Sequence, residues 1–120
     1  ENSVIKLEEK VSQYENLTGE NLIMATMAQA SFMKESEDLA AKIQSELGKN
    51  LKTPNRGVKQ AGFLVLIGAS MPNVLIEVGF ISNPSEEKML KQNSYKEKIA
   101  QAIFEGIKQF KYSREKILEG

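Results

Sequence analysis

The residue with the clearest chemical potential in this sequence is Glu77, which lies within an otherwise apolar segment, NVLIEVGFIS, at residues 73–82. The density of Val, Leu, Ile and Phe predicts a buried strand. A carboxylate in an apolar interior must find a cation, find hydrogen-bond donors or bind a proton. Glu77 is therefore a candidate catalytic acid/base. Two other interpretations are an ion pair with Arg56 or Lys59 and simple exposure at the edge of a sheet.

The composition restricts the other chemistry that this chain can perform. Its 120 residues include no cysteine and no histidine, which excludes thiol chemistry and removes the commonest general base and metal ligand. Lys plus Arg and Asp plus Glu number 16 each, so the net charge is zero and nucleic-acid binding is not indicated. No apolar run reaches the roughly 18 residues that span a bilayer, so no membrane span is expected.

Three segments have the periodicity of helices, namely residues 3–16, 20–47 and 94–112. The second is the longest; its first half is apolar almost all round, and Gly48 is a plausible stop. The third is expected to bury one face. The residues that share this face are Ile99, Ile103, Ile107 and Phe110.

Two strands are expected between the second and third helices, at residues 62–68 and 73–82. Both are continuously apolar, which favours strands covered on both faces. A further helix start follows them. Asn83 is a candidate N-cap, Pro84 occupies the first helical position, and Glu86 or Glu87 would complete a capping pattern.

These elements predict an α/β fold, in which the chain forms part of a three-layer α/β/α sheet domain with at least three helices and two core strands. Two strands are too few for an independent sheet. We therefore expect the remaining strands to lie outside this sequence, or the chain to associate with itself to cover the exposed faces. Phe63 and Phe80 are expected in the core.

Four motifs carry a resemblance to a known family: RGVKQAGFLVL at 56–66, MPNVLIEVGFISNP at 71–84, the EE pair at 86–87, and YKEKIAQAIFEGI at 95–107. Together they resemble the C-terminal part of zinc-dependent N-acetylmuramoyl-L-alanine amidases, enzymes that cleave bacterial peptidoglycan. The resemblance implies that residues 1–120 are the C-terminal portion of one catalytic domain. Within it, residues 1–47 would be helical and residues 56–112 would form a strand–strand–helix unit.

The family likeness also implies a mechanism. The domain would contain a six-stranded sheet, and zinc would be held by two histidines and a glutamate from an earlier part of the domain. Glu77 matches the family's catalytic glutamate, which takes a proton from zinc-bound water and passes a proton to the leaving amine. Because this chain has no histidine, we expect it to bind no catalytic zinc and to be inactive by itself.

Residues 20–47 are also a candidate regulatory helix. The cell-separation branch of these amidases carries an insertion here that occludes the active site until an activator protein displaces it, and the methionine-rich first half would suit an adaptable contact surface. The alternatives are a core helix, a docking module, and an inert structural fragment. Because peptidoglycan lies outside the cytoplasmic membrane, the resemblance implies an exported protein of the periplasm or cell envelope.

Overall fold

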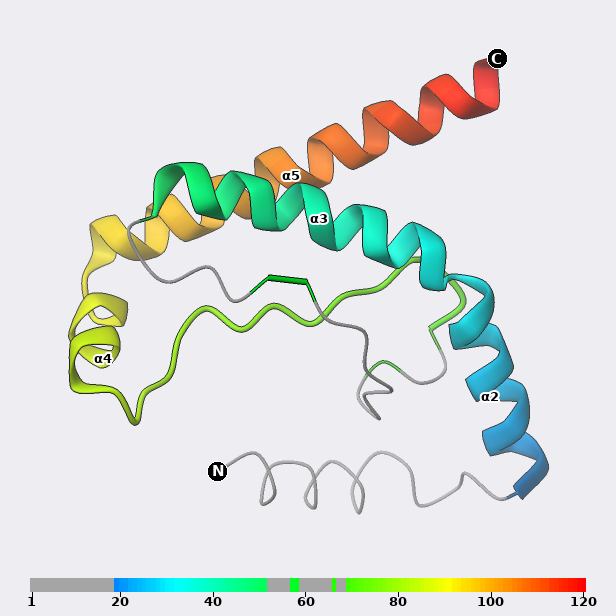
Figure 1. Ribbon diagram of the computed structural model, residues 1–120, viewed down its shortest axis with the longest axis horizontal. Helices are drawn as coiled ribbons and strands as arrows, with labels where there is room; N and C mark the ends of the chain where they lie inside the picture. Colours follow the sequence, from blue (N-terminus) through cyan, green and yellow to red (C-terminus); the bar gives the residue numbers. More distant parts are fainter. Residues whose placement is uncertain (1–18, 52–56, 59–65, 67–68) are drawn as a thin grey trace. The chain divides into compact units, whose positions relative to one another are not determined.

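The computed structural model describes residues 19–51, 57–58, 66 and 69–120 (Figure 1). The described residues contain four helices, α2 (Gly19–Ser31), α3 (Met33–Asn50), α4 (Pro84–Leu90) and α5 (Asn93–Glu119). The helix predicted at 3–16 lies outside the described residues. So does the strand predicted at 62–68, apart from Leu66, whose C=O accepts a hydrogen bond from the N–H of Ala69 at 3.3 Å.

The described residues group into two compact units. One contains α2, α3 as far as Ser36, and residues 69–73. The other contains α3 from Glu37 onward and the segment Val74–Gly120. Glu77 and the helices α4 and α5 therefore belong to the second unit, which is the unit that matters for the candidate site.

The predicted helix at 20–47 is found as two helices, because the chain turns at Phe32. At this turn the N–H of Phe32 donates to the C=O of Gln29 at 3.3 Å, which closes a tighter turn, of three residues, than the α-helical one. Just before it, the Ser31 hydroxyl donates to the C=O of Ala28 at 2.7 Å, a local bond of the kind that bends helices. The predicted stop at Gly48 is close, since α3 ends at Asn50.

The α/β prediction is wrong for the described part of the chain, where the only regular elements are the four helices and no strand is present. Residues 73–80 are neither helix nor strand, and a turn follows at 81–82. A strand exists only where its backbone groups bond to a neighbouring strand, and no described segment pairs with 73–82. The apolar pattern identified an extended segment but could not supply its partner.

α3 and α5 come into close contact in the second unit. A Cβ atom placed on Gly106 of α5 would lie 2.6 Å from the Cα of Ile43 in α3, so the two backbones approach with no room for a side chain. Ile43 is 3% exposed and Ala102, one turn from Gly106, is 1% exposed. Gly106 of α5 therefore faces α3, and Ala102 is buried one turn before it.

The buried face of α5 differs in part from the predicted one. Ile99 is buried as expected, but Ile107 is 48% exposed, and Tyr95, Ala102 and Gly106 complete the buried set. Hydrophobicity pointed to the isoleucines, whereas the close approach of α3 selects small side chains. The C-terminal segment after Tyr112, expected as an extension of this helix, is helical through Glu119.

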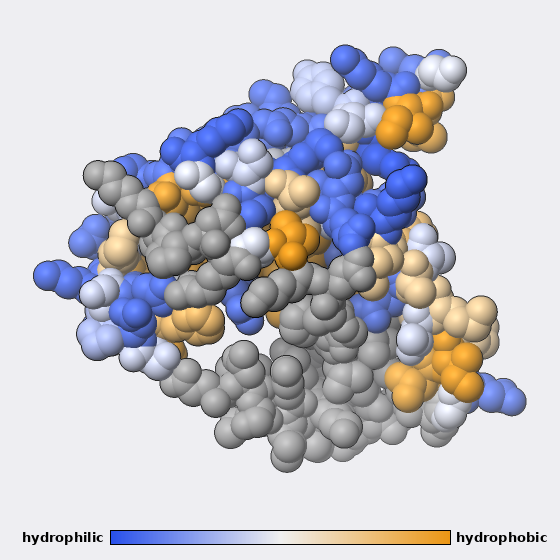
Figure 2. Space-filling model, viewed as in Figure 1, coloured by the Kyte–Doolittle hydropathy of each residue, from blue (hydrophilic) through white to orange (hydrophobic). Residues whose placement is uncertain are grey.

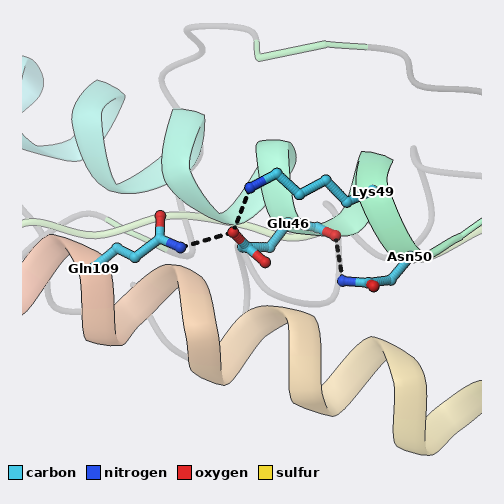
Figure 3. A network of polar contacts seen from close by, with 4 residues as sticks. All are labelled: Glu46, Lys49, Asn50 and Gln109. Atoms are coloured by element: carbon cyan, nitrogen blue, oxygen red, sulfur yellow. Dashed lines mark hydrogen bonds and ion pairs between the residues drawn. The ribbon is translucent and has the colours of Figure 1, made fainter.

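A polar cluster joins the same two helices (Figure 3). Glu46 of α3 is 7% exposed, and its Oε1 accepts hydrogen bonds from Gln109 Nε2 at 2.7 Å and from Lys49 Nζ at 3.0 Å. The Asn50 side chain donates to the C=O of Glu46 at 3.0 Å. Donation from Gln109, and then from Lys49, holds the pKa of the Glu46 carboxyl below its ordinary value despite burial.

Apolar side chains remain at the surface of α2 and at the C-terminal end of α5 (Figure 2). On α2 these are Leu22, Ile23, Met24 and Met27, which are between 39% and 69% exposed. Among the described helices, none combines the length and the hydrophobicity that a bilayer crossing requires.

Gly106→Ala should destabilise the protein, although alanine is the better helix former by up to about 1 kcal/mol. The added methyl group would meet the backbone of Ile43, and overpacking of this kind costs about 1–3 kcal/mol. Thermal unfolding followed by circular dichroism measures the change. Gly19→Ala is the matched control, because no atom lies within 4 Å of its added Cβ. A Gly106→Ala protein as stable as the parent would contradict this packing.

Glu46→Gln should reduce stability near neutral pH and have progressively less effect in acid. The folded-state pKa of Glu46 is lowered, so its ionised form contributes stability above the unfolded pKa of about 4.3, and this contribution disappears as pH falls through the folded pKa. Unfolding curves of both proteins between neutral and acidic pH test this. Gln109→Ala removes the main cause of the lowered pKa, so the loss of stability from Glu46→Gln at neutral pH should be smaller in its presence. An equal stability difference between parent and Glu46→Gln at every pH would contradict the role given to the cluster.

Candidate active site

Glu77 lies on an exposed part of the second unit, within the irregular segment that precedes α4. Within the described part of the chain, it forms no hydrogen bond or ion pair. Leu75 and Val78 beside it are 47% and 40% exposed. The buried-strand environment predicted for Glu77 is thus absent, and its carboxyl group is open to solvent. Arg56 and Lys59, the alternative partners, lie outside the described residues.

Burial alternates along the chain that leads to Glu77. Val74 and Ile76 are half-buried, whereas Leu75 and Glu77 are exposed. This is the alternation of an extended chain, in which successive side chains point to opposite sides. The extended chain therefore directs Glu77 outward without the hydrogen-bond ladder of a sheet.

Gly79 lets the backbone pass closely over α4. Its φ is +156°, a value that residues with a side chain rarely adopt. A Cβ atom at this position would lie 3.3 Å from Leu90 Cδ1 and 3.8 Å from Glu86 Cβ. The glycine two residues after Glu77 thus fixes where the segment meets the helix.

Asn83 is the N-cap of α4, as the sequence predicts. Its Oδ1 accepts hydrogen bonds from the N–H groups of Ser85 at 3.0 Å and Glu86 at 3.3 Å, and Pro84 occupies the first helical position. The cap satisfies backbone donors that the first turn leaves without partners. The sequence was sufficient here because every participant is local.

The capping pattern expected of Glu86 or Glu87 is not formed; instead, Glu86 bonds a residue that precedes the N-cap. In a capping box the glutamate at the third helical position would accept from the N–H of the N-cap residue. Here the N–H of Asn83 donates to the C=O of Phe80 at 3.1 Å, and Glu86 Oε2 accepts from the N–H of Phe80 at 2.9 Å. Glu86 is 7% exposed. Glu87 instead pairs with Lys91 at 3.0 Å.

The core prediction for Phe80 is wrong, since this side chain is 37% exposed and Ile81 after it is 75% exposed. The fold holds the backbone of Phe80, and not its side chain, through hydrogen bonds to Asn83 and Glu86. Phe63, the other phenylalanine expected in the core, lies outside the described residues.

The described residues do not fit a zinc site. The sequence contains no histidine, and among the described residues no three His, Cys, Asp or Glu side chains gather in a way that could hold a metal ion. Catalytic zinc is normally held by three protein ligands that include histidine.

Comparison with known proteins identifies the family. Residues 10–109 match the family model of N-acetylmuramoyl-L-alanine amidase, a span that contains both Glu77 and the Phe80–Asn83–Glu86 contacts. The chain belongs to the N-acetylmuramoyl-L-alanine amidase family. The resemblance inferred from the four sequence motifs is therefore confirmed at the level of the family.

Individual amidases give the same result. N-acetylmuramoyl-L-alanine amidase LytC of Bacillus subtilis strain 168 is 51% identical over 71 residues, 59% of this chain and 14% of the relative. N-acetylmuramoyl-L-alanine amidase AmiA of Escherichia coli K12 is 36% identical over 85 residues, 71% of this chain and 29% of the relative. Probable cell wall amidase LytH of Staphylococcus epidermidis ATCC 12228 is 37% identical over 79 residues, 66% of this chain and 27% of the relative.

This amidase chain thus spans between 14% and 29% of the length of these three relatives. No solved structure gives a significant match to it.

Proposed function

We propose that the protein containing this chain is a peptidoglycan hydrolase that cleaves the amide bond between N-acetylmuramic acid and L-alanine, with Glu77 as its general acid/base. The observation that carries the proposal is the match of residues 10–109 to the amidase family. The exposure of Glu77 supports it, because an acid/base must reach the substrate.

The proposed reaction is a hydrolysis in which one water molecule is added across the amide. The water oxygen bonds to the carbonyl carbon of the lactyl group while the Glu77 carboxylate accepts its proton. The C–N bond then breaks, and the carboxyl group of Glu77 returns the proton to the leaving amine of L-alanine. Glu77 ends in its starting state, so a single residue serves as base and then as acid.

Zinc is part of the proposal only for the complete enzyme. Because the sequence contains no histidine and the described residues do not fit a zinc site, we place the ligands outside this sequence, and we expect the chain alone to be inactive. When bound, the ion would supply Lewis-acid chemistry at the scissile carbonyl.

The location follows from the substrate. Peptidoglycan lies outside the cytoplasmic membrane, so we place the enzyme in the periplasm or cell envelope. The relative LytH, which is named as a probable cell wall amidase, supports this location.

Glu77→Gln in the complete enzyme should lower turnover by roughly 10²–10⁴-fold, the usual contribution of a general acid/base. Gln keeps the size of the side chain but cannot accept or return the proton. Release of L-alanine amino termini from purified peptidoglycan measures turnover, and metal analysis checks that zinc content is unchanged. Glu97→Gln, an exposed position on α5, is the matched control. Undiminished turnover in Glu77→Gln would refute the proposed role.

A second candidate function is regulation or protein docking through residues 20–47, and the exposed apolar surface of α2 favours it. Met24 and Met27 are 69% and 67% exposed and Ile23 is 60% exposed. Flexible methionine side chains suit a contact surface that adapts to a partner. We propose an activator protein as that partner and a self-inhibiting role for this helix in its absence.

Deleting residues 17–36 from the complete enzyme separates these possibilities. Self-inhibition predicts higher basal turnover in the deleted protein, whereas a core role predicts loss of folded protein by circular dichroism. Substituting Met24 and Met27 with Ser is the milder control, since both side chains are exposed and the change should leave the melting temperature unaltered. A folded deletion variant with unchanged basal turnover would count against self-inhibition.

A further inference from the structure

We propose that Glu86 is a positioning residue of this active site: its carboxylate holds the backbone at Phe80 and so fixes the direction in which Glu77 presents its carboxyl group. The inference rests on the proposed role of Glu77 and adds a residue to it. Glu86 itself is not expected to touch the substrate.

Three residues form a closed ring of hydrogen bonds at the end of the Glu77 segment. The N–H of Phe80 donates to Glu86 Oε2 at 2.9 Å, and the N–H of Asn83 donates to the C=O of Phe80 at 3.1 Å. The N–H of Glu86 donates to Asn83 Oδ1 at 3.3 Å, which closes the ring. Both backbone groups of Phe80 are therefore tied to the start of α4, three residues from Glu77.

Within the described part of the chain, the hydrogen bonds of this ring, and not those of a sheet, hold the end of the Glu77 segment. In a strand, ladder hydrogen bonds to a neighbour set the direction of each side chain. Within the described residues, segment 73–82 has no such neighbour. The Phe80 anchor and the close passage of Gly79 over Leu90 constrain the chain within three residues of Glu77.

The chemistry of Glu86 suits the task of holding a backbone. Its side chain is long enough for Oε2 to accept from the Phe80 N–H at 2.9 Å, and a buried polar group is costly unless it is paired. Glu86 is 7% exposed, yet Glu87 beside it is half-exposed and pairs with Lys91. In a capping box the side chain of Glu86 would accept from the N–H of Asn83. Here it accepts from the N–H of Phe80, so it holds the Glu77 segment in addition to the first turn of α4.

The experiment separates length from charge at position 86 in the complete enzyme. Glu86→Gln keeps the length and an acceptor oxygen but loses the charge. Glu86→Asp keeps the charge but draws the oxygen back by about one C–C bond, roughly 1.5 Å. Positioning predicts that Gln retains kcat within about threefold, whereas Asp loses at least tenfold in kcat with KM nearly unchanged, because small misplacements of a catalytic group are costly.

Glu87→Gln and Glu87→Asp are the matched controls, since they make the same two changes one residue away without touching Phe80. Their kcat should equal that of the parent. Glu86→Met is a further variant of similar length that lacks a carboxylate acceptor and suits a buried position; it should fold and lose kcat as Asp does. A Glu86→Asp or Glu86→Met protein with parental kcat would overturn the proposal. A Glu86→Gln protein that loses as much kcat as Glu86→Asp would overturn it as well.

Hydrogen exchange of the Phe80 amide supplies a readout that does not depend on turnover. It should accelerate in the Asp and Met variants and stay slow in the Gln variant; equal rates in all three would also overturn the proposal. Active Glu77→Gln enzyme would instead refute the acid/base role of Glu77 in the proposed function. An inactive Glu77→Gln protein beside a fully active Glu86→Asp protein would remove only the positioning role.

Discussion

The backbone contact between Gly106 and Ile43 fixes how closely α3 and α5 approach each other in the second compact unit. With 2.6 Å between the site of an absent Cβ and the Cα of Ile43, α3 and α5 touch at a point where only glycine fits. The nearly fully buried Ala102 continues this small-residue surface. Glu46 and Gln109 then add a part-buried hydrogen bond across the same pair of helices. Close approach excludes water, and the polar bond specifies which parts of the helices meet.

The candidate site connects to this packing through α4. This seven-residue helix is adjacent to α5, from which Lys91 and Gln92 alone separate it. A helix so short has little stability of its own, so its cap and its neighbours must hold it. Asn83 caps it and Glu86 ties it to Phe80, which makes the helix an anchor for the segment that carries Glu77. Packing between helices thus affects the position of Glu77, although this residue lies in irregular structure.

The motifs that identify the family do not by themselves give the architecture of the described residues. The motifs around Glu77 identify an amidase, yet the described residues contain helices and no strand. The apolar run at 73–82 has the composition of a buried strand, but composition supplies no partner for its backbone groups. Without one, Leu75, Val78 and Ile81 stay exposed. This is also why burial could not be inferred for Glu77: a side chain is buried by what packs on it.

The sequence by itself determined the local features of this protein. Helical periodicity predicted helices over 20–47 and 94–112, where α2, α3 and α5 lie, but not the break at Phe32. The order Asn83–Pro84 located the start of α4, because caps and periodicity involve neighbours along the chain. Only the tertiary structure decided that Gly106, rather than Ile107, faces α3, and that Glu86 reaches Phe80 instead of its own N-cap. These outcomes depend on the approach of distant segments and on backbone direction, which a one-dimensional pattern does not encode.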